Sequence, residues 1–429
     1  MSKKERVFLI GVTWGDESTD HFNESMDELH QLADTAGCEV VDTFYQASKR
    51  PNTSTYVGKG KLQEIKNAAT NSHVNTLIFN NNLSPSQSRN ISDVSGCNVV
   101  DRTEIILDIF ANHARTKQSK LQVELAQLEY AYTKLKRKWK HLSRIQGGIG
   151  FRGPGETQIE VDRREIRKKT TSLKKKIKNI EQVSLTKRNK RKDITSIALV
   201  GYTNAGKSTL FNKLTSENRY TADQLFATLD PKTRAIETES KEELVITDTI
   251  GFIRKLPHKL VTSFQSTLLE VLEADLLLHV VDVSYSNLLE LMEAVEVVLT
   301  EIKVEQKNIL IVFNKSDKMN GNHYLFTKKK LITKYPDSVF ISAKTGEGLD
   351  QLLKKIEDFL QKCKRYIELE VPVEMQNLIS FIHKNAEIIE NRFDKRTNSQ
   401  VLKLKISRQL IEGIKKQIED YKLLKYINK

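Results

Sequence analysis

The chain has 429 residues, of which 38% are hydrophobic and 29% charged, a composition that suits a globular protein of two to four domains. Its three scattered cysteines include no CxxC pair, which argues against a disulfide scaffold and a zinc ribbon. No apolar run reaches the ~18 residues of a membrane helix. We expect a monomeric, cytoplasmic protein without a membrane span.

The first 110 residues alternate between strand-like and helix-like segments. Apolar runs predict strands over 6–13, 39–45, 74–79 and 98–101. Helices are expected over 23–36, over 61–69 and from Ser84 onward. This alternation predicts a domain over 1–110 that contains a parallel α/β sheet.

Residues 111–193 form a strongly basic segment, with 24 basic and 8 acidic residues in a chain whose net charge is +14. Apolar residues in its first part recur at alternating steps of four and three, which predicts a helix with a coiled-coil seam. The glycine-rich stretch 147–157 predicts a loop, and Ile159, Ile166, Leu173 and Ile180 continue a seam at intervals of seven. We predict an antiparallel helical hairpin. Its charge either attracts a polyanion such as nucleic acid or is only a solvated helix surface. The seam residues of the first part are Leu121, Leu125, Leu128, Tyr132, Leu135, Trp139 and Leu142.

Two further domains follow. Strands are predicted over 196–200, 243–248, 275–282, 308–313 and 338–341, mostly with helices between them, which indicates a doubly wound α/β domain over 194–363. A small α+β domain over 364–429 has strands predicted at 366–371 and 401–406 and helices at 374–389 and 408–424.

A phosphate-binding motif, GxxxxGK[ST], lies between the first strand of the doubly wound domain and a helix. Its backbone N–H groups and the helix N-terminus favour phosphate oxygens. We expect Lys207 to reach the β- and γ-phosphates and Ser208 to bind Mg²⁺. The motif consists of Gly201, Tyr202, Thr203, Asn204, Ala205, Gly206, Lys207 and Ser208.

A second motif, DTIG, ends the next apolar strand. Its aspartate can hold a water bound to Mg²⁺, and the Gly251 amide can contact a γ-phosphate. The residue after it, Phe252, cannot hydrogen-bond a water, so either a partner completes the site or another residue supplies that contact. A Phe252 that is only a packed residue of the switch is compatible with both. The motif consists of Asp248, Thr249, Ile250 and Gly251.

Two motifs at later strand ends predict guanine recognition. The Asp317 carboxylate can accept both the N1–H and the 2-amino group of guanine, a donor pair that adenine lacks, and the Ala343 amide can donate to O6. The four motifs in this order predict a GTPase that uses Mg²⁺. The two base-reading motifs are Asn314, Lys315, Ser316, Asp317 and Ser342, Ala343, Lys344.

Two assignments stay open from the residues alone. A threonine should reach Mg²⁺ in the GTP state, and spacing does not choose among Thr215, Thr221, Thr228, Thr233 and Thr238. Asn204 in the phosphate loop either helps to hold a K⁺ beside the phosphates or caps loop amides.

These motifs, with the segments Gly58-Lys-Gly-Lys-Leu-Gln-Glu-Ile65 and Gly147–Thr157, resemble the HflX family of translation-associated GTPases. The resemblance covers nearly the whole chain. It implies that the FATLD stretch is the first switch, with Thr228 on Mg²⁺ and with Lys207, Thr228 and Gly251 as the residues of catalysis. The FATLD stretch consists of Phe226, Ala227, Thr228, Leu229 and Asp230.

The resemblance also implies a partner and a function. It implies a GTPase that binds the large (50S) ribosomal subunit and its ribosomal RNA, and that splits or rescues stalled 70S ribosomes under stress. The first helix of the hairpin departs from the family, because 131–139 lacks the usual Pro-Arg-Leu run and is more basic. Other hypotheses are a ribosome-assembly GTPase, a paralogue that gives antibiotic resistance, and an RNA-remodelling ATPase.

Overall fold

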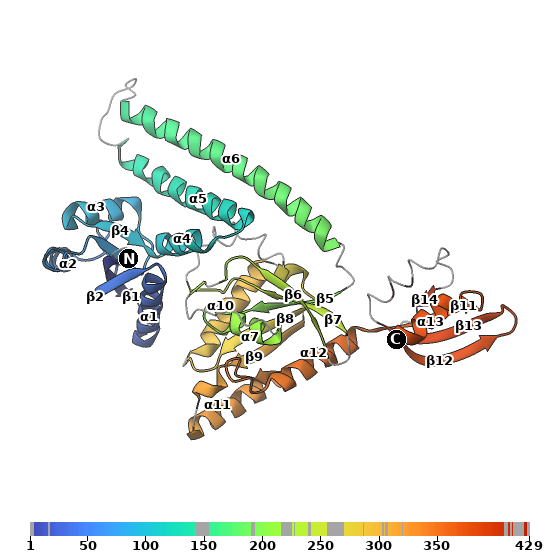
Figure 1. Ribbon diagram of the computed structural model, residues 1–429. Helices are drawn as coiled ribbons and strands as arrows, with labels where there is room; N and C mark the ends of the chain where they lie inside the picture. Colours follow the sequence, from blue (N-terminus) through green and yellow to red (C-terminus); the bar gives the residue numbers. More distant parts are fainter. Residues whose placement is uncertain are drawn as a thin grey trace.

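Within its described residues, the computed structural model has three β-sheets and a long helical hairpin (Figure 1). Among the described residues, no helix is both long enough and apolar enough to cross a membrane. The structure describes residues 4–15, 18–142, 154–189, 194–215, 225–226, 228–238, 242–254, 270–285, 287–302, 304, 308–319, 321–406, 411, 414 and 424–426.

The first sheet is parallel throughout and has the strand order β2-β1-β3-β4. Its strands are β1 (Glu5–Trp14), β2 (Cys38–Ser48), β3 (Thr76–Phe79) and β4 (Asn98–Asp101). The helices are α1 (Thr19–Thr35), α2 (Lys59–Ser72), α3 (Pro85–Ser95) and α4 (Arg102–His113). Capping boxes at Ser84 and Asp101 fix the starts of α3 and α4, because each side chain accepts a hydrogen bond from an otherwise unpaired backbone N–H. The parallel α/β sheet predicted for this part is confirmed.

The basic segment forms two long helices, α5 (Lys117–Leu142) and α6 (Pro154–Asn189), which lie side by side (Figure 1). Leu121, Leu125 and Leu128 of α5 pack with Leu173 and Ile177 of α6, which confirms this part of the predicted seam. The side chains of the seam beyond position 134 in α5 lie outside the described residues.

The predicted loop over 147–157 is too long at its C-terminal end. Helix α6 already begins at Pro154, so residues 154–157 form its first turn. Proline is tolerated there because the first backbone N–H of a helix has no partner within the helix. The remainder of the predicted loop lies outside the described residues.

The second sheet has the order β10-β9-β8-β5-β7-β6 and is parallel except at its edge. The predicted strands are present. The edge strand β6 runs antiparallel to β7 and was missed in the sequence, where its alternating charged residues gave no apolar run. The strands are β5 (Thr195–Val200), β6 (Lys232–Glu237), β7 (Glu243–Asp248), β8 (Leu276–Asp282), β9 (Asn308–Asn314) and β10 (Val339–Phe340).

Helices cover this sheet, and the last of them leads to the third sheet (Figure 1). They are α7 (Lys207–Leu214), α10 (Leu288–Glu301), α11 (Gly321–Lys334) and α12 (Leu349–Cys363), with a 3₁₀ turn at Ser316–Lys318.

The third sheet has the order β12-β13-β11-β14 and is antiparallel. The helix predicted over 374–389 is wrong at its end, because the helix covers only Gln376–Asn385 (α13) and β12 (Glu387–Asp394) follows. Of the helix predicted over 408–424, the structure describes only Ile411 and Ile414, both helical, and position 424, which is in a strand. The other strands are β11 (Arg365–Pro372), β13 (Ser399–Ile406) and β14 (Leu424–Tyr426).

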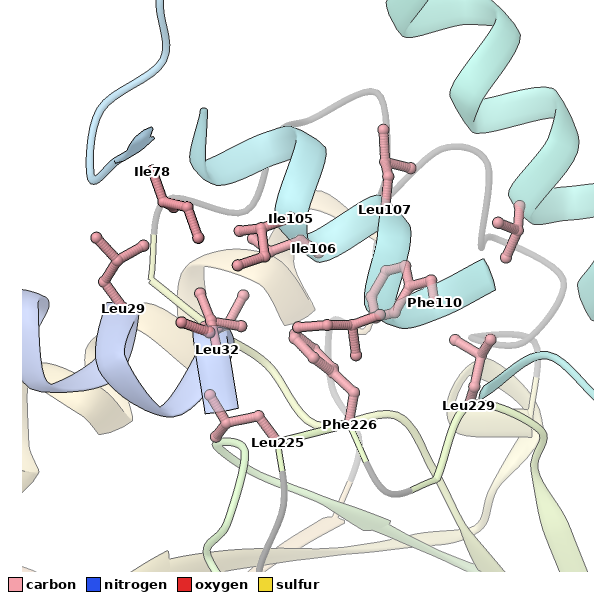
Figure 2. Close-up of a cluster of buried hydrophobic side chains, with 14 of the residues drawn as sticks. Leu29, Leu32, Ile78, Ile105, Ile106, Leu107, Phe110, Leu225, Phe226 and Leu229 are labelled. Carbon is pink, nitrogen blue, oxygen red and sulfur yellow. The ribbon is translucent and has the colours of Figure 1, made fainter. Parts of the chain in front are cut away.

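One hydrophobic core joins the first sheet's domain to loops around the second sheet (Figure 2). Phe110 of α4 packs edge to face on Phe226, with ring centroids 4.6 Å apart. The same core holds Leu225, Leu229 and Ile253 from the second domain. Burial of so many large apolar side chains stabilises this contact, at about 1.5–3 kcal/mol for each one fully removed from water.

Candidate nucleotide site

The phosphate loop follows β5 and has a backbone that requires glycine at two positions. Gly206 has φ +92°, and a Cβ there would lie 2.2 Å from Nδ2 of Asn314. Gly201 has φ +147°, and a Cβ there would lie 2.2 Å from the Val280 carbonyl oxygen of β8. Both positions therefore exclude a side chain, and the loop leads into the N-terminus of α7, where backbone N–H groups favour an anion.

Lys207, the first residue of α7, is buried beneath this loop. Its Nζ donates to the carbonyl oxygens of Gly201 (3.1 Å) and Tyr202 (2.7 Å). Burial, with a smaller contribution from the charge of Lys315, lowers the pKa of Lys207 to about 8, although Asp248 acts in the opposite direction. A phosphate group would supply the negative charge that this buried ammonium group lacks.

Three oxygen-bearing side chains meet at the start of α7. Ser208 Oγ lies 2.8 Å from Asp248 Oδ2 and 2.9 Å from Thr228 Oγ1, which itself donates to Asp248 Oδ2 at 2.9 Å. Among the threonines between α7 and Asp248 that the structure describes, Thr228 reaches this point. Thr233 pairs with Thr247, whereas Thr215 and Thr238 bond to neighbouring backbone.

This cluster suits a magnesium ion. Mg²⁺ prefers oxygen ligands and is commonly held by one carboxylate, hydroxyls and substrate phosphates. Asp248 is fully buried, and its Oδ1 has no hydrogen-bond partner among the described residues. Burial raises the pKa of Asp248 above its usual range. The hydrogen bonds from Ser208 and Thr228 and the charge of Lys207 oppose this but do not cancel it. A cation would stabilise the ionised carboxylate, and a water bound to that cation would donate to the unpaired Oδ1.

The loop after β7 lies directly against the phosphate loop. A Cβ at Gly251 would lie 2.8 Å from Thr203 Cα and 2.9 Å from Lys207 Nζ, so glycine alone fits between them. Phe252 exchanges backbone hydrogen bonds with Gly201 and Thr203. Its side chain is 4% exposed and packs in the core with Val271 and Val295, which supports the interpretation of Phe252 as a packed residue of the switch.

The predicted base-reading residues are brought together by their own hydrogen bonds. Asn314 donates from Nδ2 to the Ala205 carbonyl (2.8 Å) and accepts from the Ala343 amide (2.9 Å), so it joins the phosphate loop to the 342–344 loop. Ser342 Oγ donates to Asp317 Oδ1 (2.6 Å), which orients the carboxylate. Lys344 is exposed beside them.

Lys315 is held by a residue that the sequence analysis missed. Its Nζ lies 2.8 Å from Asp282 Oδ2, at the end of β8. A carboxylate at the C-terminal end of an otherwise apolar strand was the available signal, because ligands gather at that edge of a parallel sheet.

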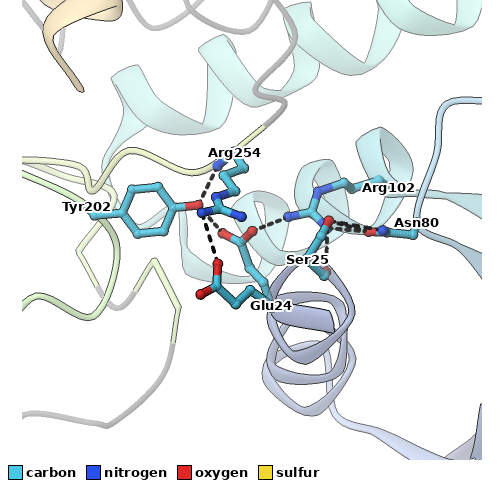
Figure 3. A network of polar contacts seen from close by, with 7 residues as sticks. Glu24, Ser25, Asn80, Arg102, Tyr202 and Arg254 are labelled. Atoms are coloured by element: carbon cyan, nitrogen blue, oxygen red, sulfur yellow. Dashed lines mark hydrogen bonds and ion pairs between the residues drawn. The ribbon is translucent and has the colours of Figure 1, made fainter. Parts of the chain in front are cut away.

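The phosphate loop also makes a polar contact with the first domain, which sequence analysis did not reveal (Figure 3). The Tyr202 hydroxyl donates to Glu28 Oε1 (2.6 Å) and accepts from the Arg254 amide (2.7 Å). Glu28 also forms a buried ion pair with Arg102 (2.6 Å), and Arg254 Nη2 lies 3.2 Å from Glu24. Helix α1 therefore contacts both the phosphate loop and the loop that follows Gly251.

Most of the FATLD stretch faces the first domain. The side chains of Phe226 and Leu229 are buried in the shared hydrophobic core, whereas the Thr228 side chain points to Ser208 and Asp248. The carboxylate of Asp230 accepts hydrogen bonds from the backbone just before α5. Ala227 lies outside the described residues.

Three features on one doubly wound sheet define a P-loop GTPase. They are a phosphate loop, a guanine subsite built on Asp317, and the buried cluster of Ser208, Thr228 and Asp248 that suits Mg²⁺, which we call the magnesium-type cluster. Family models match in sequence along the chain: "GTP-binding GTPase N-terminal" over 23–111, "GTP-binding GTPase Middle Region" over 113–191, "50S ribosome-binding GTPase" over 196–315 and "HflX C-terminal domain" over 328–423. The chain belongs to the HflX family of GTPases, as the resemblance implied.

Curated relatives are similar over most of their length. GTPase HflX of Caldanaerobacter subterraneus is 42% identical over 92% of this chain and 89% of its own. GTPase HflX of Escherichia coli is 42% identical over 83% of both chains. A solved GTP-binding protein of Sulfolobus solfataricus, in complex with GDP, is 30% identical with a TM-score of 0.45 and covers 82% of this chain and 98% of its own.

Proposed function

We propose that this GTPase binds the large ribosomal subunit through the hairpin of α5 and α6, and splits or rescues stalled 70S ribosomes under stress. The observation that supports this most directly is the charge on α6. Arg164, Arg167, Lys168 and Lys175 are exposed, and with Thr171 and Ser172 they line a shallow surface groove. Clustered exposed cations on a projecting element suit the phosphate backbone of RNA.

The nucleotide site supplies the energy-dependent step. Lys207 would neutralise the β- and γ-phosphates, and Asp317 would select guanine. Ser208 and Thr228 would bind Mg²⁺ directly and Asp248 through a water, and the ion when bound neutralises developing phosphate charge. The Gly251 amide would sense the γ-phosphate. Because Phe252 is buried and apolar, no side chain at that position orients the attacking water, which suits a GTPase whose hydrolysis a partner stimulates.

A potassium ion is part of this proposal through Asn204. This residue has φ +60° in the phosphate loop, an uncommon conformation for a residue other than glycine. If its side chain helps to hold K⁺ beside the phosphates, hydrolysis should be faster in KCl than in NaCl at equal ionic strength. Asn204→Ala should remove this difference. Equal rates in the two salts would remove K⁺ from the mechanism.

The arm can be tested by its charge. Arg164→Gln, Lys168→Gln and Lys175→Gln together should weaken binding to large subunits and reduce the slope of log affinity against log salt by roughly 2 to 3. The matched control removes three exposed lysines from the GTPase domain, Lys329, Lys330 and Lys354. If the control weakens binding as much as the arm variant, the RNA-binding surface is not the arm.

The tip can be tested by replacing 147–153 with a Gly/Ser linker, which leaves the start of α6 at Pro154 unchanged. GTP binding should stay, whereas stimulation of hydrolysis by large subunits and splitting of 70S particles should disappear. A replaced-tip protein that is stimulated as strongly as the parent would show that the tip is only a connector.

Ribosome assembly and antibiotic resistance are the alternative functions on the same surface. Sedimentation of purified 70S particles with the protein and GTP separates them, because only a splitting factor yields free subunits. Intact 70S particles under saturating protein would favour the assembly function. Protection of translation from a ribosome-targeting antibiotic would favour the resistance function.

A further inference from the structure

The start of α5 is fastened to the FATLD stretch. Asp230 Oδ2 accepts from the backbone amides of Arg115 (3.0 Å) and Thr116 (3.1 Å), and Oδ1 accepts from the Thr116 hydroxyl at 2.6 Å. Both carboxylate oxygens therefore accept hydrogen bonds from the two residues that precede this 26-residue helix.

Thr116 is also the residue that caps α5. Its Oγ1 accepts from the Ser119 amide (3.1 Å), and its carbonyl accepts from the Lys120 amide (3.1 Å). Asp230 therefore places a negative charge at a helix N-terminus, where it interacts favourably with the helix dipole.

Asp230, which bonds to the start of α5, is close in sequence to the magnesium-type cluster. Asp230 follows Thr228 by two residues, a span of at most roughly 7 Å. The intervening Leu229 is 2% exposed and anchored in the shared core, as is Phe226 on the other side. Thr228 thus lies between anchored neighbours, so its position depends on where the first domain and the start of α5 hold them.

We propose that Thr116, which lies outside the GTPase domain, is a positioning residue for GTP hydrolysis: through Asp230 it sets the position of the Thr228 hydroxyl at the Mg²⁺ and γ-phosphate side of the site. The same contact links the nucleotide state to the arm, because α5 is one of its two helices. Val123 and Ala126 pack α5 into the shared core, while Leu125 packs it on α6.

The link acts in both directions. GTP binding that requires Thr228 in its present position also favours the hydrogen bonds between Asp230 and the start of α5, and thereby the present position of the arm. A ligand that favours this position of the arm must then raise the affinity for GTP by the same factor. The part of this inference that concerns the arm rests on the proposed ribosome function. The part that concerns the position of Thr228 can be tested on the isolated protein alone.

The first experiment measures the affinities of the isolated protein for GDP and for a non-hydrolysable GTP analogue, and single-turnover hydrolysis. Thr116→Ala should lower the analogue-to-GDP affinity ratio and the hydrolysis rate at least about fivefold, the lower end of measured couplings between sites. GDP affinity should change less than about twofold, because Thr228 engages mainly in the GTP state.

Two control variants separate positioning from loss of a helix cap. Thr116→Ser keeps the hydroxyl and should restore the parent ratio. Ser84→Ala removes the capping hydroxyl of α3, which bonds to Ser86 and Gln87 and makes no hydrogen bond with the described residues of the FATLD stretch, and should leave the ratio unchanged. If Thr116→Ala keeps the parent ratio, or if Ser84→Ala lowers it equally, the positioning role is refuted.

Asp230→Asn tests the same link from the other side, and serves if Thr116→Ala fails to fold. It should lower the ratio similarly, and the double variant should add less than the sum of the two, because both changes weaken the hydrogen bonding between Asp230 and Thr116. Full additivity would overturn the proposal.

Adding large subunits tests the part that concerns the arm. They should raise the affinity of the parent for the GTP analogue over GDP, and Thr116→Ala should reduce that preference while still binding subunits. An unaltered preference in Thr116→Ala refutes the link to the arm. If the parent itself does not bind large subunits, the proposed function fails, whereas the results on the isolated protein still decide the positioning role.

Discussion

The two ends of the nucleotide site are held in different ways. At the base end, Asn314, Asp317, Ser342 and Ala343 bond to one another and to the phosphate loop, all within the GTPase sheet. At the phosphate end, Tyr202 and the FATLD stretch are fastened to α1, α4 and the start of α5. The base end is thus self-contained, whereas the phosphate end is shared with another domain.

This difference separates recognition from regulation. The choice of guanine needs a fixed set of donors and acceptors, which neighbouring loops of one sheet can supply. Sensing a γ-phosphate requires segments with two positions, and contacts with a second domain can favour one of them. If this is correct, substitutions at the two ends of the site should have separate effects.

The largest expected effect is on stability. Arg102 is 1% exposed and pairs with Glu28, so Arg102→Met leaves a buried carboxylate without its positively charged partner. We expect a loss of about 3–5 kcal/mol in the free energy of unfolding, measured by denaturant titration. Arg89→Met, at an exposed position on α3, should change it by less than about 0.5 kcal/mol. In folded Arg102→Met the preference for guanine should persist. Loss of that preference would show that the base end is not self-contained.

The second effect is on hydrolysis. Ser208→Ala or Thr228→Ala should slow GTP turnover at least about 100-fold, because each removes an oxygen from the magnesium-type cluster. GDP affinity should fall for Ser208→Ala and change little for Thr228→Ala. Thr215→Ala is the control, because the Thr215 hydroxyl donates to the Phe211 carbonyl oxygen of α7. Normal turnover in Thr228→Ala would assign the Mg²⁺ contact to another threonine.

The third effect is on base choice. Asp317→Asn should weaken GTP binding by roughly 10- to 100-fold, since a charge-assisted hydrogen bond contributes about 1.5–3 kcal/mol. Xanthine nucleotides should bind the variant better, because their 2-oxo group suits an amide donor. Competition binding with GTP, ATP and XTP measures this. Equal binding of ATP and GTP by the parent would contradict the assignment of Asp317.

The smallest effect is on pH dependence. With a pKa of about 8 in the nucleotide-free protein, Lys207 loses its charge as the pH rises, so GDP affinity should fall about fourfold between pH 7 and 8.5. Lys207→Ala should bind weakly without this slope. The free energy of unfolding should change in the opposite direction. Because the pKa of Lys207 is lower in the folded protein than in the unfolded chain, the buried charge destabilises the fold below about pH 8, and the free energy of unfolding rises between about pH 8 and 10.5. A flat GDP affinity in the parent would contradict the buried-lysine interpretation.

Much of the fold was predictable because its strands are apolar runs of regular length. The parallel strands of the first two sheets could be predicted for this reason, whereas β6 and β12 could not. β6 (KTRAIE) and β12 (EIIENRFD) are edge strands with largely exposed side chains, so hydrogen bonds to β7 and β13 decide their conformation. The helix predicted over 374–389 was extended too far for the same reason.

By itself, the sequence determined the nucleotide motifs, their order at strand ends and the charge of the arm, since each depends on residues close together in the chain. Spacing left the magnesium threonine open and the family resemblance implied Thr228, and the tertiary structure brings Thr228, rather than Thr233, to Ser208 and Asp248. Only the tertiary structure decided that Tyr202 reaches Glu28. It also decided that Asp230 bonds to Thr116. These pairs are separated by up to 174 residues, and no local pattern specifies them, because the packing of α1 and α4 against the GTPase domain brings the partners together.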